Sequence, residues 1–266
     1  MSKWVWRSMF VIVLGLLAPF GSVAAASSMT LFDSEALTKG VLRVNYEQSP
    51  DRETIIRVTK GKVSYDYRMS PGAQYPLQLG DGVYKVLIAQ SVSDTKYKVI
   101  TQEELTLKQG VGNDVFLQSI SLINWSNSTS AVIKARELTL RAETDQAKLK
   151  AIYTYITKNI KYDTLEAKTV SSKYTPEVDE IYKSSKGICY DFATLFAAMA
   201  RSAGLPTKVV KGYHADAPAT YHAWNEVYID NKWQTVDTTY DAAYVQHGKT
   251  PTLFKAASQY KTVKFY

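Results

Sequence analysis

The chain has 266 residues, of which 45% are hydrophobic and 21% are charged, and its formal net charge is +7. These values place it among ordinary globular proteins, with enough length for one large domain or two modest ones. The sequence has no run of Lys and Arg and no aromatic-basic repeat, so nucleic acid is not expected as a partner. If the protein is exported, its basic surface favours contact with anionic envelope polymers.

The first residues have the pattern of an export signal. Lys3 and Arg7 precede an apolar stretch over residues 9–20, and small residues follow up to Ala26. This stretch is shorter than the roughly 18 to 20 residues that a membrane-spanning helix needs, and the alternative, an uncleaved N-terminal anchor, would require a longer one. We therefore predict a signal peptide over residues 1–26, a secreted or extracytoplasmic mature protein, and no membrane span after cleavage.

Residues 27–125 are predicted to form a small β-rich module. Between Val41 and Leu117, Val, Ile, Tyr and Thr recur, several times in alternation, and Gly, Asp, Ser and Pro fill the turns. This pattern is typical of the short strands of a β-sandwich-like unit. The segment contains no His, no Cys and no clustered carboxylates, so we expect a scaffold or a binding module.

The pattern changes after a polar stretch, residues 124–130, which predicts a linker. Apolar residues recur at helical spacing from Leu149 to Ile160, with Thr144 or Asp145 as the N-cap. Residues 126–266 are therefore predicted to form a second domain that begins with helical structure.

A second helix is predicted to begin at Cys189 and to end at the stop signal that Gly204 introduces. Two strands follow, over residues 222–229 and 232–240, joined by a tight turn at Asp230 and Asn231. Helices followed by antiparallel strands predict the α+β class for this half of the chain.

Cys189 is the only cysteine of the chain, and it lies at the N-terminal edge of a predicted helix. The helix dipole and the unpaired N–H groups there favour a thiolate. A two-residue turn in the following hairpin would place Asp237 opposite Trp224, on the strand face of His222, whereas a three-residue turn would place it on the other face. Each residue also has a structural interpretation: a small core thiol, a strand histidine with satisfied nitrogens, and a turn-forming carboxylate.

Three motifs in this half resemble the transglutaminase-like superfamily, which is related in fold to papain-type thiol proteases. They are "GICYDFATLFAAMARSAGLPTKVVKGY", then "HAWNEVYI" and "KWQTVDTTY", and the resemblance covers residues 149–240. It implies a papain/transglutaminase-like core over residues 126–266, with Cys189 as nucleophile, His222 as base and Asp237 as the orienting carboxylate. Supporting strand positions are implied for Trp224, Glu226 and Trp233.

The sequence departs from the animal-type members of this superfamily in two ways. Tyr190 stands where those members have Trp, and no spaced acidic run resembles a calcium loop. We therefore expect no metal and no cofactor. Tyr190, His214 and Trp224 are candidate neighbours of the substrate or the oxyanion, and the Cys189 backbone N–H is the expected oxyanion donor.

The resemblance implies an exported, bacterial-type thiol enzyme. Such an enzyme transfers the acyl group of a glutamine carboxamide or peptide carbonyl through a Cys thioester to an amine or to water. The expected partner is a protein or an envelope-peptide substrate. Two alternatives remain open: a cysteine peptidase or amidase acting on such peptides, and a catalytically idle binding protein that uses the same cleft.

Overall fold

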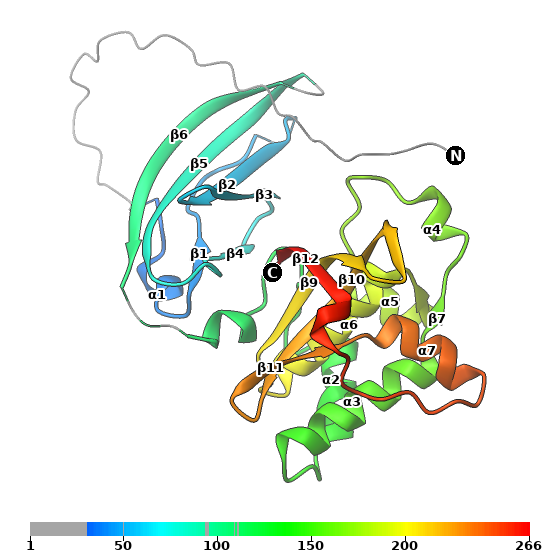
Figure 1. Ribbon diagram of the computed structural model, residues 1–266. Helices are drawn as coiled ribbons and strands as arrows, with labels where there is room; N and C mark the ends of the chain where they lie inside the picture. The colour runs from blue at the N-terminus through cyan, green and yellow to red at the C-terminus, as the bar shows by residue number, and fades with distance from the viewer. Residues whose placement is uncertain (1–30, 50, 94–95, 109, 111) are drawn as a thin grey trace, which may run out of the picture. The chain divides into compact units, whose positions relative to one another are not determined.

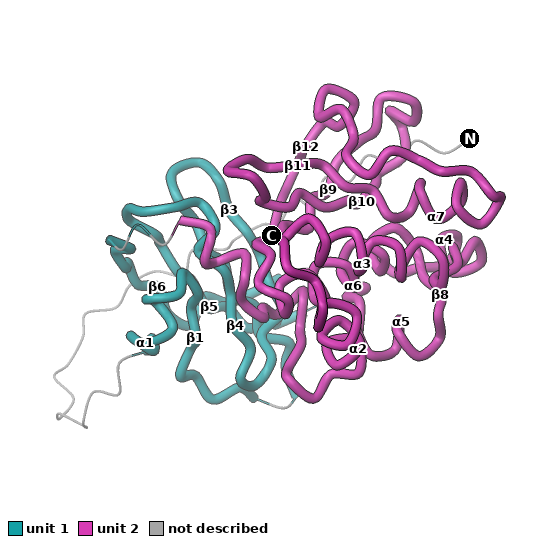
Figure 2. The backbone as a smooth tube through the Cα atoms, turned by 90° about the horizontal axis from the view of Figure 1, so that it is seen from below, with its two compact units in different colours: residues 1–110 teal, residues 111–266 magenta. Residues whose placement is uncertain are grey.

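The computed structural model describes residues 31–49, 51–93, 96–108, 110 and 112–266. The predicted signal peptide over residues 1–26 lies outside these residues. Within them, no helix combines the length and the apolar character needed to cross a membrane. The chain divides into two compact units, residues 1–110 and residues 111–266 (Figure 2).

The first unit consists mainly of antiparallel strands (Figure 1). One sheet has four strands in the order β3-β2-β5-β6, and β1 pairs with β4 in a second, two-stranded sheet. The elements are α1 (Ser34–Leu37), β1 (Val41–Arg43), β2 (Thr54–Lys60), β3 (Val63–Arg68), β4 (Gln74–Pro76), β5 (Gly82–Ser93) and β6 (Lys96–Leu107).

The core of this unit follows the period-two pattern of the sequence. On β2, Ile56 and Val58 are buried and their neighbours are partly exposed, and Tyr84, Val86 and Ile88 of β5 continue the same buried face. Alternation of this kind is what a sheet with one buried face requires. The β-rich character expected for this part of the chain is therefore confirmed.

The second unit contains helices and a four-stranded antiparallel sheet in the order β11-β10-β9-β12. Helix α6 packs against β9 and β10, and α2 and α3 pack against α6 (Figure 1). The predicted α+β class is confirmed. Its helices are η1 (Asp114–Leu117), α2 (Ser130–Thr139), α3 (Asp145–Asn159), α4 (Glu166–Thr169), α5 (Val178–Ser184), α6 (Cys189–Ser202), α7 (Thr238–Gln246) and η2 (Ala257–Gln259). Its strands are β7 (Lys161–Tyr162), β8 (Lys186–Gly187), β9 (Thr207–His214), β10 (Ala217–Ile229), β11 (Lys232–Val236) and β12 (Tyr260–Phe265).

The division between the units falls after residue 110, earlier than the expected boundary after residue 125. The segment between these positions packs within the second unit. Phe116 of η1 is buried, with its ring 5.2 Å from that of Trp233 and 6.1 Å from that of Phe265. Arg201 of α6 donates to the carbonyl of Gln118 at 2.7 Å. These long-range contacts, which local polarity does not reveal, assign the segment to the second unit.

Both predicted helices are present. Helix α3 begins after Thr144, whose hydroxyl accepts from the N–H of Ala147, as an N-cap does. Helix α6 begins at Cys189, and Gly204 follows its end with φ 85°, a conformation that favours glycine.

The hairpin between β10 and β11 has the predicted two-residue turn. Asp230 and Asn231 have φ 52° and 61°, as both central residues of a type I′ turn require. The ladder from Ile229–Lys232 to Asn225–Val236 keeps this register throughout. The second strand is shorter than predicted, however: it ends at Val236, because Asp237 starts helix α7.

Candidate active site

Cys189 is the first residue of α6, and it is partly exposed. The start of this helix is fixed by Asp191, whose Oδ2 accepts from the N–H of Ile188 at 2.7 Å. A Cβ on Gly187 would lie 2.5 Å from the Asp191 Cβ, so the fold requires glycine two residues before the cysteine. Glycine is therefore required at position 187 because the Asp191 side chain folds back over the start of the helix.

His222 and Asp237 meet directly. The Nε2 atom of His222 lies 2.7 Å from the Oδ2 atom of Asp237, and the two side chains are 6% and 0% exposed. His222 also lies close enough to Cys189 for this residue to help raise the pKa of the imidazole. Because Nε2 faces Asp237, Nδ1 is the nitrogen that remains for the sulfur. The fold therefore brings the three predicted residues together from the start of α6, from β10 and from the residue after β11.

Both oxygens of Asp237 are engaged. Oδ1 accepts from the N–H groups of Thr239 and Tyr240, each at 3.2 Å, and so caps helix α7. Oδ2 accepts from His222 at 2.7 Å and from the hydroxyl of Tyr260 at 3.1 Å. A carboxylate held by four donors has little freedom to turn, so its direction toward the imidazole is fixed.

Aromatic rings stack on the imidazole of His222. The ring of Tyr240 is 4.7 Å away at an interplanar angle of 20°, and that of Trp224 is 6.1 Å away at 26°. Trp224 is 1% exposed, consistent with a supporting position on the strand. Asn225 ties this strand to the cysteine helix, because its Nδ2 donates to the carbonyl of Ala193 at 2.9 Å. The relative positions of thiol and imidazole are thus set by buried packing.

The pKa of His222 is raised from its usual 6.5 to about 9. Burial acts in the opposite direction and lowers the pKa of this imidazole. The hydrogen bond with Asp237, the proximity of Cys189 and the negative charge of Asp237 together outweigh the burial. The imidazole is therefore held as an imidazolium at neutral pH.

This raised pKa predicts a pH-dependent stability. The charged imidazole stabilises the fold fully below about pH 6.5, and the contribution is lost as the pH rises through about 9. Between these values we expect the unfolding free energy of the parent to fall by on the order of 3 kcal/mol more than that of His222→Gln, because each unit of pKa shift corresponds to about 1.4 kcal/mol. Urea unfolding at a series of pH values measures the difference. Parallel pH curves for the two proteins would contradict the prediction.

Two of the predicted neighbours, Tyr190 and His214, are buried behind the three candidate residues. The ring of Tyr190 is buried, with the Nζ atom of Lys211 3.3 Å from its centroid. His214 is 7% exposed, and its ring makes edge contacts with Tyr240 at 5.1 Å and Tyr260 at 4.8 Å. These side chains present little surface to a substrate, so their visible contribution is to the packing around His222.

Two other predicted strand residues lie farther along the sheet. Glu226 forms an ion pair with Lys208 at 3.0 Å, and Trp233 lies beneath the same lysine, with its ring centroid 3.7 Å from Nζ. Both contacts stabilise the β9-β10-β11 part of the sheet, in keeping with supporting positions.

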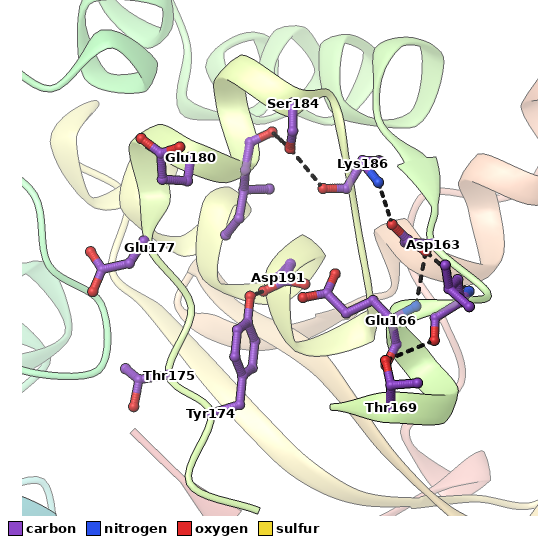
Figure 3. Close-up of a pocket in the computed structure, with 12 residues that line it drawn as sticks. Asp163, Glu166, Thr169, Tyr174, Thr175, Glu177, Glu180, Ser184, Lys186 and Asp191 are labelled. Carbon is purple, nitrogen blue, oxygen red and sulfur yellow. Dashed lines mark hydrogen bonds and ion pairs between the residues drawn. The ribbon is translucent and has the colours of Figure 1, made fainter. Parts of the chain in front are cut away.

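An acid-rich cavity of about 530 Å³ lies beside the first turn of α6 (Figure 3). Its lining includes Asp163, Glu166, Tyr174, Lys186 and Asp191, and the hydroxyl of Tyr174 donates to Asp191 at 2.7 Å. Burial raises the pKa of Asp191 to about 6, although its hydrogen bonds with Tyr174 and with the Ile188 amide oppose the shift. The lining does not include the thiol, so this cavity lies next to the candidate site. Over the part of the chain that the structure describes, no three His, Cys, Asp or Glu residues form a group that could hold a metal.

Sequence reasoning missed Asp191, Tyr240 and Tyr260 as parts of the site. The first two fall inside the motifs quoted above, and Asp191 stands at the N3 position of a helix that begins at Cys189, where a carboxylate is a known capping signal. Tyr260 lies 23 residues beyond Asp237, and no local signal connects the two.

Residues 134–238 match the family model described as the Transglutaminase-like superfamily. The chain contains a transglutaminase-like domain. The matched segment includes Cys189, His222 and Asp237, which confirms the family predicted from the three motifs.

The chain is also similar to curated and solved proteins. Over 118 residues, 41% of this chain, it is 30% identical to the Kyphoscoliosis peptidase of Mus musculus and, equally, of Homo sapiens. The chain spans only 18% of the length of these relatives. A proposed cysteine protease from Cytophaga hutchinsonii is 16% identical, with 80% of this chain and 76% of that one covered and a TM-score of 0.45. The periplasmic domain of TgpA from Pseudomonas aeruginosa is 17% identical, with 85% and 98% covered and a TM-score of 0.41.

Proposed function

We propose that this protein is a thiol enzyme in which Cys189 is the nucleophile, His222 the general acid and base, and Asp237 the group that orients the imidazole. The observation that carries the proposal is the imidazole of His222, which hydrogen-bonds Asp237 through Nε2 at 2.7 Å and has Cys189 as its other polar neighbour. A nucleophile, a base and an orienting group in contact are the requirement for nucleophilic catalysis.

The reaction proceeds in two balanced steps. The Cys189 thiolate attacks the carbonyl carbon of a carboxamide or peptide and forms a C–S bond, and the imidazolium of His222 gives its proton to the departing ammonia or amine as the C–N bond breaks. Water or an amine then attacks the thioester, His222 takes the proton of this acceptor, and the thiolate leaves. Asp237 holds the imidazole in place through both steps.

The tetrahedral intermediate of each step carries a negative oxygen. The backbone N–H of Cys189 lies in the first turn of α6, where N–H groups have no acceptor within the helix. Together with the positive end of the helix, this N–H is the oxyanion donor in the proposed mechanism.

The acyl acceptor decides between two outcomes. An amine gives transfer and cross-linking, and water gives hydrolysis. The name of the similar Kyphoscoliosis peptidase favours peptide hydrolysis as the second candidate. We propose a protein or envelope-peptide substrate and an extracytoplasmic location, supported by the charged, apolar and small-residue pattern of residues 1–26, with anionic envelope polymers as further contacts of the basic protein.

The assay that tests the proposal uses a glutamine-containing peptide with and without a primary amine, followed by mass spectrometry. We expect an amine adduct, a deamidated product or a cleaved peptide with the parent protein, and none with Cys189→Ala. A parent that turns nothing over, and that binds the peptide as well as Cys189→Ala does, would favour the binding-protein alternative.

A further inference from the structure

We propose that Tyr260 of β12 is a positioning residue of the site: its hydroxyl donates to Asp237 and holds this carboxylate at the angle that meets His222. The inference rests on the proposed function, because a positioning role has meaning only if His222 and Cys189 perform the chemistry.

The hydrogen bond itself is the first argument. The hydroxyl of Tyr260 lies 3.1 Å from the same Oδ2 atom that accepts from His222 at 2.7 Å. Burial, and after it the charge of Asp237, raise the pKa of Tyr260, so the phenol keeps its proton and acts as the donor. Since Oδ2 carries two donors from two directions, the loss of one leaves this oxygen held by the imidazole alone.

The second argument is that the fold fixes the ring of Tyr260. Tyr260 pairs with His214 in the ladder between β12 and β9, and its ring lies 4.8 Å from that of His214 and 5.0 Å from that of Trp224. A side chain packed on two sides delivers its hydroxyl to a defined point, which is what a positioning residue must do.

Gly212 of β9 makes this close approach of β12 possible. A Cβ at this position would lie 2.0 Å from the carbonyl oxygen of Lys261 and 2.9 Å from the ring of Trp224. Gly212, the next-to-last residue of the first quoted motif, therefore allows the strand that carries Tyr260 to pack here. That strand lies beyond residue 238, where the family match ends, so the match does not imply the role of Tyr260.

The pKa of His222 depends on this arrangement and on the other titratable groups around the imidazole. The imidazole hydrogen-bonds Asp237 and lies near Cys189, and Lys211 interacts with the same cysteine. The groups that face the site are Tyr162 from β7, Cys189 from α6, Lys211 and His214 from β9, Asp237 and Tyr240 at the start of α7, and Tyr260 from β12.

The test is Tyr260→Phe, which removes the hydroxyl and keeps the ring. We expect the His222 titration midpoint, measured by NMR and assigned by its loss in His222→Gln, to rise by about half a pH unit, because a carboxylate that has lost one donor holds the imidazolium more strongly. We expect kcat to fall about tenfold with little change in KM, because the carboxylate then lacks the donor that sets the angle at which its Oδ2 meets the imidazole.

Tyr153→Phe is the matched control. Its hydroxyl also donates to a buried carboxylate of this unit, Asp241, at 2.8 Å, but that carboxylate does not touch His222. The control should lose similar thermal stability and keep the parent's titration midpoint and kcat. A midpoint in Tyr260→Phe that is unchanged or lower, or a kcat equal to that of the control, would overturn the inference. Turnover that persists in Cys189→Ala would instead overturn the proposed function on which it rests.

Discussion

Cys189→Ala is expected to abolish turnover, with a loss on the order of 10⁴ or more, and to leave the fold intact. The chain has no other cysteine that could replace the nucleophile. Cys189 is partly exposed and its side chain makes no disulfide, so the substitution removes little buried surface. Turnover of a glutamine peptide, together with thermal unfolding, measures both halves of the prediction. Full activity in this variant would refute the mechanism.

His222→Ala is expected to cost about as much as Cys189→Ala, and the double variant should be no worse than either. A base serves only the nucleophile that it activates, so removal of one member already removes the benefit of the other. Multiplied losses in the double variant would indicate that the two residues act independently and would contradict the proposed unit.

His247→Ala is the matched histidine control. His247 follows α7, and its Nδ1 lies 2.7 Å from the carbonyl of Ala243 on an exposed part of the helix end, so we expect activity close to that of the parent. His214→Ala is less suitable, because this ring is buried against Tyr240 and Tyr260 and its loss would disturb the packing behind His222. A complete loss of activity in His247→Ala would mean that the wrong base has been assigned.

The parts of the site that could be predicted from sequence depend on local rules. The cysteine helix follows from apolar periodicity and from Gly204, and the hairpin register follows from the conformations that Asp230 and Asn231 adopt readily. Once this register is fixed, the proximity of His222 and Asp237 can be predicted, because alternate residues of a strand lie on the same face of the sheet.

Other parts depend on contacts between residues that are far apart in the sequence, which local sequence patterns do not reveal. Asp237 was expected within a strand, yet it is followed by residues that can continue either as a strand or as a helix, and the helix forms with Asp237 as its cap. Likewise, the boundary after residue 110 depends on Phe116, whose partners Trp233 and Phe265 lie more than a hundred residues later. Tyr260 is a third case, because a strand pairing places it behind the carboxylate.

The double role of Asp237 allows its catalytic and structural contributions to be separated. Oδ1 caps α7, and Oδ2 binds His222 and Tyr260. Asparagine at position 237 retains an oxygen that can cap the helix. Alanine would remove the cap and the contact with His222 together, so their contributions could not be separated. Thr144→Ala is the matched control for capping, because its hydroxyl caps α3 through the N–H of Ala147, away from the three residues.

Asp237→Asn is expected to reduce the rate by about 10³- to 10⁴-fold, because an amide in the place of Oδ2 reverses the hydrogen bond and holds the imidazole in the wrong tautomer. The cap of α7 should remain, and the unfolding free energy at neutral pH should fall by about 1.4 kcal/mol for each unit by which the pKa of His222 falls. The pKa of His222, about 9 in the parent, should fall, because burial lowers it and only the contact with Cys189 would still oppose that effect. Thr144→Ala should lose about 1 kcal/mol of stability and keep the parent's rate. Rate, His222 titration and urea unfolding on the three proteins distinguish the roles, and an Asp237→Asn variant with the parent's rate and titration would show that Asp237 serves only to cap the helix.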